Sequence, residues 1–548
     1  MIKRILLISL IASLGIGLTS FVKSEFELAK HLDIYYSLVK EVLINYVDEV
    51  DPGELIEHSI TGMLKELDPY TNYIPENDIE NIRLLTTGEY GGIGAVYRQR
   101  EGINYIVEPY ENSPASKAGL RPGDIVLSVD GRSIDGMSPD ELSEIFQGQP
   151  GTKITLTIRR PGETELLTKE LIREKIETKS VPYHGILENG IAYMNLSSFT
   201  TKAHQEIFAA IKELEKEQDL NGIIIDVRNN PGGLLMEAVK IVNLFVPKGQ
   251  EVVSTKGKVE IHHHTYLTPV EPHNLEVPVA VLINSQSASA SEIVSGALQD
   301  LDRAVVIGER SFGKGLVQQN RDLSYNAKLK ITTAKYYIPS GRCIQAVDYS
   351  LRDENGRIAS IPDSLMKEFT TKNGRKVYDG GGIMPDLEVK NENLSELGTK
   401  LYLRDIIFDF ATQYYLQHDT ILPPKSFTIT DSDYQDFIAF VKEQSFDFTR
   451  ETEKALAELK EMAQEDQLYD RFAKSFDQLA EDLKPNLEEE LMYYRAELTD
   501  LIQTEIIFRY FGTSGQIEYS LQEDKVVQEA LKTLSDSAHY QTILGNNP

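Results

Sequence analysis

The chain has 548 residues, of which 41% are hydrophobic and 26% are charged. This length is too great for a single core, so roughly three or four domains of an ordinary soluble globular protein are expected. The formal net charge of −29 argues against a nucleic-acid binder, which would carry a basic face. The single cysteine, Cys343, excludes a disulfide framework.

Residues 1–23 have the pattern of an export segment. Lys3 and Arg4 precede the uncharged residues 5–22, which fit a signal peptide or, at the lower limit of length, a membrane anchor. No A-x-A pattern marks a cleavage point, and a buried core helix is the plain alternative. Either export outcome places the bulk of the chain outside the cytoplasm, in the periplasm or another extracytoplasmic space, with or without an anchor in the inner membrane.

Residues 24–84 are expected to be helical. Apolar residues recur at helical spacing between positions 28 and 43, and the Asp-Pro pair at 51–52 opens a second helix. The Asp-Pro pair at 68–69 predicts the turn chemistry that ends it. A stripe of this kind is usually a packing surface, so no catalytic role is expected here.

Residues 85–174 change character, because short β-like runs alternate with turns. A glycine cluster at 91–94 is followed by ENSPASKAGLRPGDIVLSVDG at 111–131, and this order resembles a PDZ domain. In such a domain consecutive backbone N–H groups bind a terminal carboxylate, and an edge strand pairs with the peptide. The resemblance assigns the carboxylate loop to Gly91, Gly92, Ile93, Gly94 and Ala95.

Residues 175–395 predict an α/β core with a largely parallel sheet, because strand–helix units repeat along them. The expected strands are 191–196, 222–227, 279–283, 304–307 and 329–337, and the expected helices are 203–216, 234–244 and one that starts near 290. The turn Arg228–Gly233 joins a strand to a helix and contains two glycines. Such a turn exposes N–H groups suited to an oxyanion hole, although a sharp turn that simply needs glycine is the plain alternative.

Ser289 lies in a loop of small residues between the strand 279–283 and a helix that starts at Ala290 or Ser291. This position presents a hydroxyl at the end of the sheet, where the free N–H groups of a first helical turn face developing negative charge. A serine nucleophile still needs a base.

Lys314 is the candidate base, because no histidine lies between His273 and His418. It sits on a glycine-flanked loop, and Gln318 follows four residues later, on the same side of a helix or strand. A lysine acts as a base only when it is neutral, so burial must lower its pKa by several units. Phe312 and the flanking glycines predict an apolar, charge-poor setting for it.

These residues resemble a known family. SASASE, then Lys314, then Gln318 is similar to the carboxyl-terminal processing, or tail-specific, proteases, from about residue 51 to about residue 390. The resemblance implies a ClpP/crotonase-like α/β protease core with an inserted β-rich PDZ domain, a helical platform before it and helices after it. It also implies a catalytic set of Ser289, Lys314 and Gln318, with oxyanion donors from Gly232 or Gly233 and from Ala290. No cofactor is expected.

Several other residues are interpreted as structural. The consecutive histidines 262–264 lack the spacing of a tetrahedral site, so no metal is expected. Asp226 and Arg228 are expected to be structural partners, and Ser287 and Ser291 to be loop and cap residues.

The expected organisation is an export segment at 1–23, a helical platform at 24–84, a PDZ domain at 85–174, a protease core at 175–395 and a helical extension at 396–548. The extension is acidic, and its helices predict solvated faces, with self-association or adaptor docking as an expected role. The predicted function is a serine endopeptidase that binds apolar C-terminal tails of exported proteins and cleaves them through an acyl-enzyme. The alternative is an inactive PDZ scaffold that binds C-terminal peptides.

Overall fold

The computed structural model describes residues 26–352, 358–390, 393–444, 446, 448–484 and 486–546. The export segment predicted at 1–23 lies outside these residues. Within the described ranges, no helix combines the length and the apolar character that crossing a membrane requires. The chain forms two compact units. The first comprises the residues up to Glu76 together with Gln318–Thr332, and the second contains the rest.

The first unit contains a helix at 26–45 and α2 (Pro52–Lys65). Asp51 caps α2 by accepting a hydrogen bond from the Glu54 N–H at 2.9 Å, and Pro52 occupies the first turn, where its missing N–H is not needed. Both predicted helices are therefore confirmed. The segment also contains a strand that was not expected, β1 (Asn72–Ile74), which pairs antiparallel with β18 (Lys328–Tyr337). Pairing with a strand so distant in sequence leaves no local pattern.

The second unit is built on a six-stranded sheet in the order β10-β11-β12-β15-β16-β23. Its strands are β10 (Tyr183–Ile186), β11 (Ile191–Asn195), β12 (Gly222–Asp226), β15 (Val279–Ile283), β16 (Val305–Gly308) and β23 (Leu387–Glu388). All neighbours are parallel except β10 and β11. The predicted parallel α/β core is thus confirmed. Parallel order brings the carboxyl ends of β12 and β15, and the turns that follow them, to one edge of the sheet.

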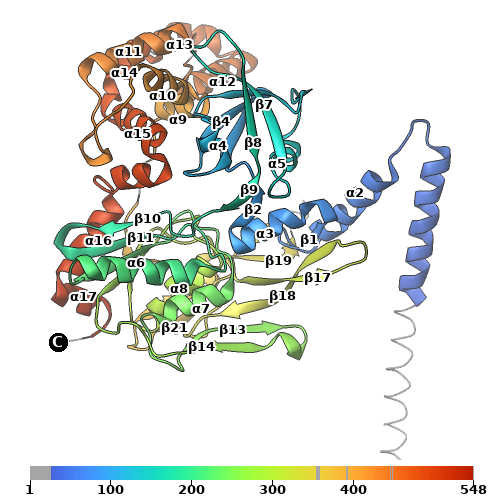
Figure 1. Ribbon diagram of the computed structural model, residues 1–548, viewed down its shortest axis with the longest axis vertical. Coiled ribbons are helices and arrows are strands. Elements are labelled where there is room, and N and C mark those ends of the chain that lie inside the picture. The colour runs from blue at the N-terminus through green and yellow to red at the C-terminus, as the bar shows by residue number, and fades with distance from the viewer. Residues whose placement is uncertain are drawn as a thin grey trace, which may run out of the picture. The chain divides into compact units, whose positions relative to one another are not determined.

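Both faces of this sheet are covered by helices. Ile223 and Ile225 of β12 face a core with α6 (Ala203–Glu217), α7 (Leu235–Asn243) and α8 (Ala290–Asp300). Ile224, between them, faces the opposite way, as strand geometry requires, and packs in a cluster with α16 (Lys525–Ser535) and α17 (Ser537–Ile543), red in Figure 1. One face of α16 and Tyr540 of α17 are therefore buried in the core, whereas the exposed residues of both helices form the solvated faces that were expected.

The PDZ region forms a second sheet, in the order β3-β4-β5-β7-β8 with β6 beside β5. Its elements are β3 (Ala95–Arg100), β4 (Ile103–Pro109), α4 (Pro114–Lys117), β5 (Ile125–Val129), β6 (Arg132–Ser133), α5 (Pro139–Phe146), β7 (Lys153–Arg159) and β8 (Leu167–Ile172). The chain enters and leaves it through a ladder of β2 (Glu89–Gly92) with β9 (Glu174–Glu177). Strand β3 is the edge of the described sheet, and α5 lies beside it, because the Tyr97 and Phe146 rings meet edge to face at 5.1 Å.

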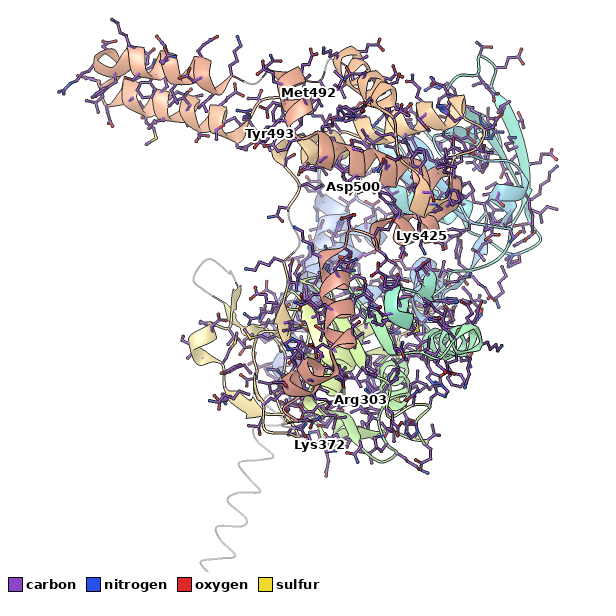
Figure 2. The ribbon with its side chains drawn as sticks, turned by 90° about the vertical axis from the view of Figure 1, so that its left-hand side faces the viewer. Arg303, Lys372, Lys425, Met492, Tyr493 and Asp500 are labelled. Carbon is purple, nitrogen blue, oxygen red and sulfur yellow. The ribbon has the colours of Figure 1, made fainter. Side chains whose placement is uncertain are left out.

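Residues 396–520 form a helical region with its own core. Its helices are α9 (Glu396–Leu403), α10 (Ile406–Gln417), α11 (Asp431–Glu443), α12 (Glu451–Glu465), α13 (Tyr469–Leu483), α14 (Leu487–Tyr493) and α15 (Arg495–Ser520). Phe410, Tyr434, Phe437 and Ile506 are among its buried residues. Figure 2 shows α12 and α13 projecting as a hairpin, with Met492 and Tyr493 near its base.

The helical region is attached to the PDZ sheet by polar contacts. Arg100 of β3 pairs with Asp409 of α10 at 2.9 Å. Glu108 of β4 accepts hydrogen bonds from the N–H and the hydroxyl of Thr513, at 3.1 and 3.0 Å. Gly512 of α15 has φ of 61°, and a Cβ there would lie 2.6 Å from the Glu108 carboxylate, so this contact requires glycine.

The remaining elements of the second unit are α3 (Ile79–Thr87), β13 (Glu251–Gly257), β14 (His264–Leu267), β19 (Val347–Arg352), β20 (Ile358–Ser360), β21 (Glu368–Thr370) and β22 (Lys376–Tyr378). Strand β13 pairs with β14 and with the last residues of β18. The latter pairing fixes the segment that carries Tyr336 beside the core.

Candidate active site

Ser289 occupies a sharp turn between β15 and α8. Its backbone has φ of 56° and ψ of −111°, a conformation that side-chain-bearing residues rarely adopt, and it is the N-cap residue of α8. Gly232 lies against this turn, because a Cβ at Gly232 would lie 2.8 Å from the Ser289 Cβ and 2.9 Å from the Ala290 nitrogen. The predicted strand–turn–helix is confirmed, and its strained turn is the geometry that presents a nucleophilic hydroxyl at the end of a sheet.

Two buried side chains hold the Ser289 turn and the Lys314 loop together. One carboxylate oxygen of Glu292, in the first turn of α8, accepts from the Ser289 N–H at 2.8 Å and from the Lys314 N–H at 2.9 Å. The hydroxyl of Tyr336 donates to the Ser289 carbonyl at 3.1 Å and also contacts the Lys314 carbonyl. The backbones of Ser289 and Lys314 are therefore adjacent, and Lys314 is half-buried.

The surroundings of the Lys314 loop differ from the apolar, charge-poor setting that was expected. Phe312 is 51% exposed and so covers little of the loop. Glu292 is fully buried and accepts two more hydrogen bonds, from the Gly313 N–H at 2.7 Å and the Ser311 hydroxyl at 2.5 Å. Burial raises the pKa of Glu292 to about 6, although its four hydrogen bonds favour the charged form. A carboxyl group rather than an aromatic ring therefore organises this loop.

Glu292, Tyr336 and Gln345 are site residues that the sequence reasoning missed. Gln345 accepts the Gly315 N–H at 2.7 Å and so fixes the residue after Lys314. The glutamate at the end of SASASE was a usable signal, because an acidic residue at the third helical position is typical of an N-cap arrangement. Nothing local marks Tyr336 or Gln345, whose roles arise from pairing distant segments.

The turn after β12 lies beside Ser289. The Asn230 carbonyl accepts from the Ala288 N–H at 3.0 Å, and its side-chain oxygen accepts from the Gly232 N–H at 2.9 Å. The Gly232 N–H is thus engaged, whereas the hydrogen bonds among the described residues use neither the Gly233 N–H nor the Ala290 N–H as a donor. Of the two glycines offered by the sequence, Gly233 is the better candidate for an oxyanion donor, together with Ala290.

Gln318 belongs to the first compact unit and lies on β17 (Leu316–Asp322). Its side-chain amide donates to the Thr332 hydroxyl at 3.2 Å, within that unit. Its predicted role in orienting Lys314 stays a prediction.

The other serines and the Asp226–Arg228 pair are structural, as expected. Buried Ser287 donates to the Val227 carbonyl at 2.8 Å, and buried Ser291 donates to the Asn230 carbonyl at 2.9 Å. Both hydroxyls join the loop after β15 to the turn after β12. Arg228 forms an ion pair with Asp226 at 2.6 Å.

Two curated proteins match this chain over most of their length. The chain is 40% identical over 321 residues to the "Carboxy-terminal-processing protease" of Bartonella bacilliformis, covering 58% of this chain and 73% of that protein. It is 33% identical over 340 residues to the "Probable CtpA-like serine protease" of Staphylococcus haemolyticus, covering 62% of this chain and 67% of that protein. The chain belongs to the carboxy-terminal processing proteases of peptidase family S41.

The predicted membership of this protease family, with a PDZ domain, is therefore confirmed. The profile of peptidase family S41 matches residues 190–350, which include Ser289 and Lys314. A PDZ domain matches 105–160, and the family described as "Probable PDZ-protease, C-terminal helical domain" matches 397–534. The solved photosystem II D1 C-terminal processing protease is 24% identical, over 66% of this chain and 93% of that chain, with a TM-score of 0.35.

The predicted carboxylate loop of this processing protease is split between a strand and a turn. Gly91 and Gly92 lie on β2 and pair with β9, so they belong to the connection into the PDZ domain. Ile93 is buried, Gly94 has φ of 72°, and Ala95 begins the edge strand β3. Only these last three residues form the turn that leads into β3.

Proposed function

We propose that this protein is a serine endopeptidase that binds apolar C-terminal tails through its PDZ domain and cleaves the same proteins by a Ser/Lys mechanism. The observation that carries the proposal is the shared anchoring of Ser289 and Lys314. Glu292 binds both N–H groups, and Tyr336 binds both carbonyls. This backbone anchoring of the two loops supports the pairing, because base-assisted nucleophilic catalysis requires the hydroxyl and the amine to be held close together.

The proposed reaction proceeds in two halves. The neutral amine of Lys314 takes the proton of the Ser289 hydroxyl as the oxygen attacks the scissile carbonyl carbon. The Gly233 and Ala290 N–H groups stabilise the resulting oxyanion. The lysine ammonium then protonates the leaving amine, and the C–N bond breaks to give the acyl-enzyme. A water that loses a proton to Lys314 hydrolyses the ester, and Ser289 recovers its proton. Gln318 orients the amine in this proposal.

Tail recognition is proposed at β3. This edge strand has hydrogen-bonding groups available for one more strand, and a peptide added there ends at the turn of Ile93, Gly94 and Ala95. The N–H groups of that turn suit a terminal carboxylate, and an apolar peptide end is the ligand expected from the resemblance to tail-specific proteases. The favoured ligand is therefore a C-terminal peptide with an apolar end.

The proposal also includes the location of the protein and the subclass of its core fold. The charged and apolar residues at 1–22 support export to the periplasm or another extracytoplasmic space. The parallel strands β11, β12 and β15, each followed by a helix on one face, support a ClpP/crotonase-like core.

A defined reporter tests this function. A folded carrier protein with an apolar C-terminal tail, a matched carrier with a charged tail, and a third with an amidated apolar tail are incubated with the purified full chain. We expect cleavage of the first at least about tenfold faster than of the others, since the carboxylate and the apolar end are both recognised. New C-termini are mapped by mass spectrometry. Equal rates for all three tails would contradict PDZ-mediated selection, and no cleavage of any carrier would favour the scaffold.

Glu292→Gln should lower kcat by about 10- to 100-fold, because an amide cannot accept all four hydrogen bonds and misplaces the two loops. In the unchanged enzyme, kcat/KM should fall as pH falls through about 6, where Glu292 gains a proton, and this acid limb of the pH profile should be absent in the variant.

The contribution of Glu292 to folding stability changes with pH in the opposite direction to its effect on kcat/KM. A carboxyl pKa raised from 4.5 to about 6 contributes stability below 4.5 that is lost as pH rises through 6. An unchanged acid limb in the variant would contradict this role for Glu292.

A further inference from the structure

The C-terminal extension reaches the turn beside Ser289 through one ion pair. Arg228, the first residue of that turn, lies between two carboxylates. Asp226, at the end of β12, is 2.6 Å away, and Asp524, from the extension, is 2.7 Å away. Arg228 is only 12% exposed and Asp524 only 16%, so solvent screens this pair weakly. A second nitrogen of Arg228 donates to the other oxygen of Asp524 at 3.1 Å, so the ion pair is bidentate.

The Asp524 side chain is also fixed by hydrogen bonds at the start of α16. Its side chain caps α16 by accepting from the N–H groups of Val526 and Val527, at 2.9 and 3.1 Å. The apolar face of α16 is buried against the central sheet. The carboxylate therefore stands on an element packed on the core, and it presents a fixed negative charge to Arg228.

Successive residues of the turn that Arg228 begins form hydrogen bonds with the loop that carries Ser289. The Asn229 N–H donates to Asn284, which follows β15, at 3.0 Å, and the Asn284 amide donates back to Asn229 at 2.7 Å. Asn230 holds Ala288, as described above. A displacement of Arg228 is thus expected to reach the Ser289 turn, because Asn229 and Asn230, which make these two contacts, directly follow Arg228.

We propose that Asp524 is a positioning residue of the active site, and that the C-terminal extension completes the oxyanion turn by fixing Arg228. This inference rests on the proposed peptidase function. Asp524 touches neither Ser289 nor Lys314, so it acts through Arg228 and the turn. The extension is then an integral part of the catalytic core and not only a docking module.

The test compares two capping aspartates of the extension. Asp524→Asn keeps a capping side chain for α16 but removes the charge that faces Arg228. Asp536→Asn is the matched control, because Asp536 caps α17 and forms no ion pair within the described residues. We expect kcat to fall about tenfold in Asp524→Asn with KM within about twofold, and both to stay unchanged in the control. Asp524→Glu, which restores the charge, should recover part of kcat.

Hydrogen–deuterium exchange supplies a readout that does not depend on catalysis. The peptide covering 228–234 should exchange faster in Asp524→Asn than in the unchanged protein, while peptides from α16 stay protected. Unchanged exchange and unchanged kcat in Asp524→Asn would overturn the proposal, as would an equal loss of kcat in Asp536→Asn. If the unchanged protein cleaves nothing, the peptidase function fails, and exchange at 228–234 still decides whether Asp524 positions the turn.

Discussion

Replacing Ser289 by alanine should lower kcat by roughly 10⁴- to 10⁶-fold while the protein stays folded, because the nucleophile is removed and its backbone contacts are kept. The Ser289 N–H and carbonyl, which bind Glu292 and Tyr336, are unchanged by this substitution. The residual rate measures what the oxyanion turn contributes without a nucleophile. The measurement is release of the carrier's C-terminal tail, followed by mass spectrometry.

Ser285→Ala is the matched control, because Ser285 is an exposed serine in the same loop. It should retain full activity. A serine-reactive phosphonate should label the unchanged protein at Ser289 and fail to label Ser289→Ala. Labelling at another serine, or full cleavage by Ser289→Ala, would contradict the assignment of the nucleophile.

Replacing Lys314 by methionine should lower kcat by roughly 10³- to 10⁴-fold, since methionine fills a similar volume and cannot accept a proton. The Lys314 N–H and carbonyl still bind Glu292 and Tyr336, so the loop should keep its place. The thermal unfolding midpoint should therefore change little, and substrate binding to the PDZ domain should be unaffected. Rates over a range of pH, with fluorescence anisotropy of a tail peptide, check both points.

Two further lysine variants sharpen this result. Lys335→Met, at an exposed position on β18, is the control and should behave like the unchanged protein. Lys314→His should not restore activity, because imidazole is shorter and aims its nitrogens differently. Near-normal turnover in Lys314→His would contradict the lysine-base geometry, and an inactive unchanged protein that still binds tail peptides would support the scaffold function.

Much of the core could be predicted because local patterns determine it. The apolar run at 279–283 and the stripe of Ala203, Ile207 and Ile211 are read directly as a buried strand and a packed helix. Ser289 is recognised from its place between such elements. The Asp68 turn also follows local rules, since its side chain accepts the Tyr70 and Thr71 N–H groups, both at 2.8 Å.

What could not be predicted depends on distant segments meeting. Strand β1 has three residues and gains its pairing from β18, more than 250 positions later. The Tyr336 hydroxyl reaches the Ser289 carbonyl only because β18 passes beside α8. The burial of Val527 and Leu531 of α16 was detectable, because they continue an apolar helical stripe, but the acidity of the region favoured a solvated interpretation.

The contact between the PDZ sheet and the helical region has a consequence for the peptides that the proposed cleavage would release. Glu108 binds Thr513 at the kink of α15, and the chain that follows this helix reaches Asp524, which pairs with Arg228. Under the proposed function, a tail bound at β3 is joined to the turn beside Ser289 through α15 and Asp524. We then expect the length of peptide removed to be counted from the substrate's last residue, whatever side chains flank the cleaved bond.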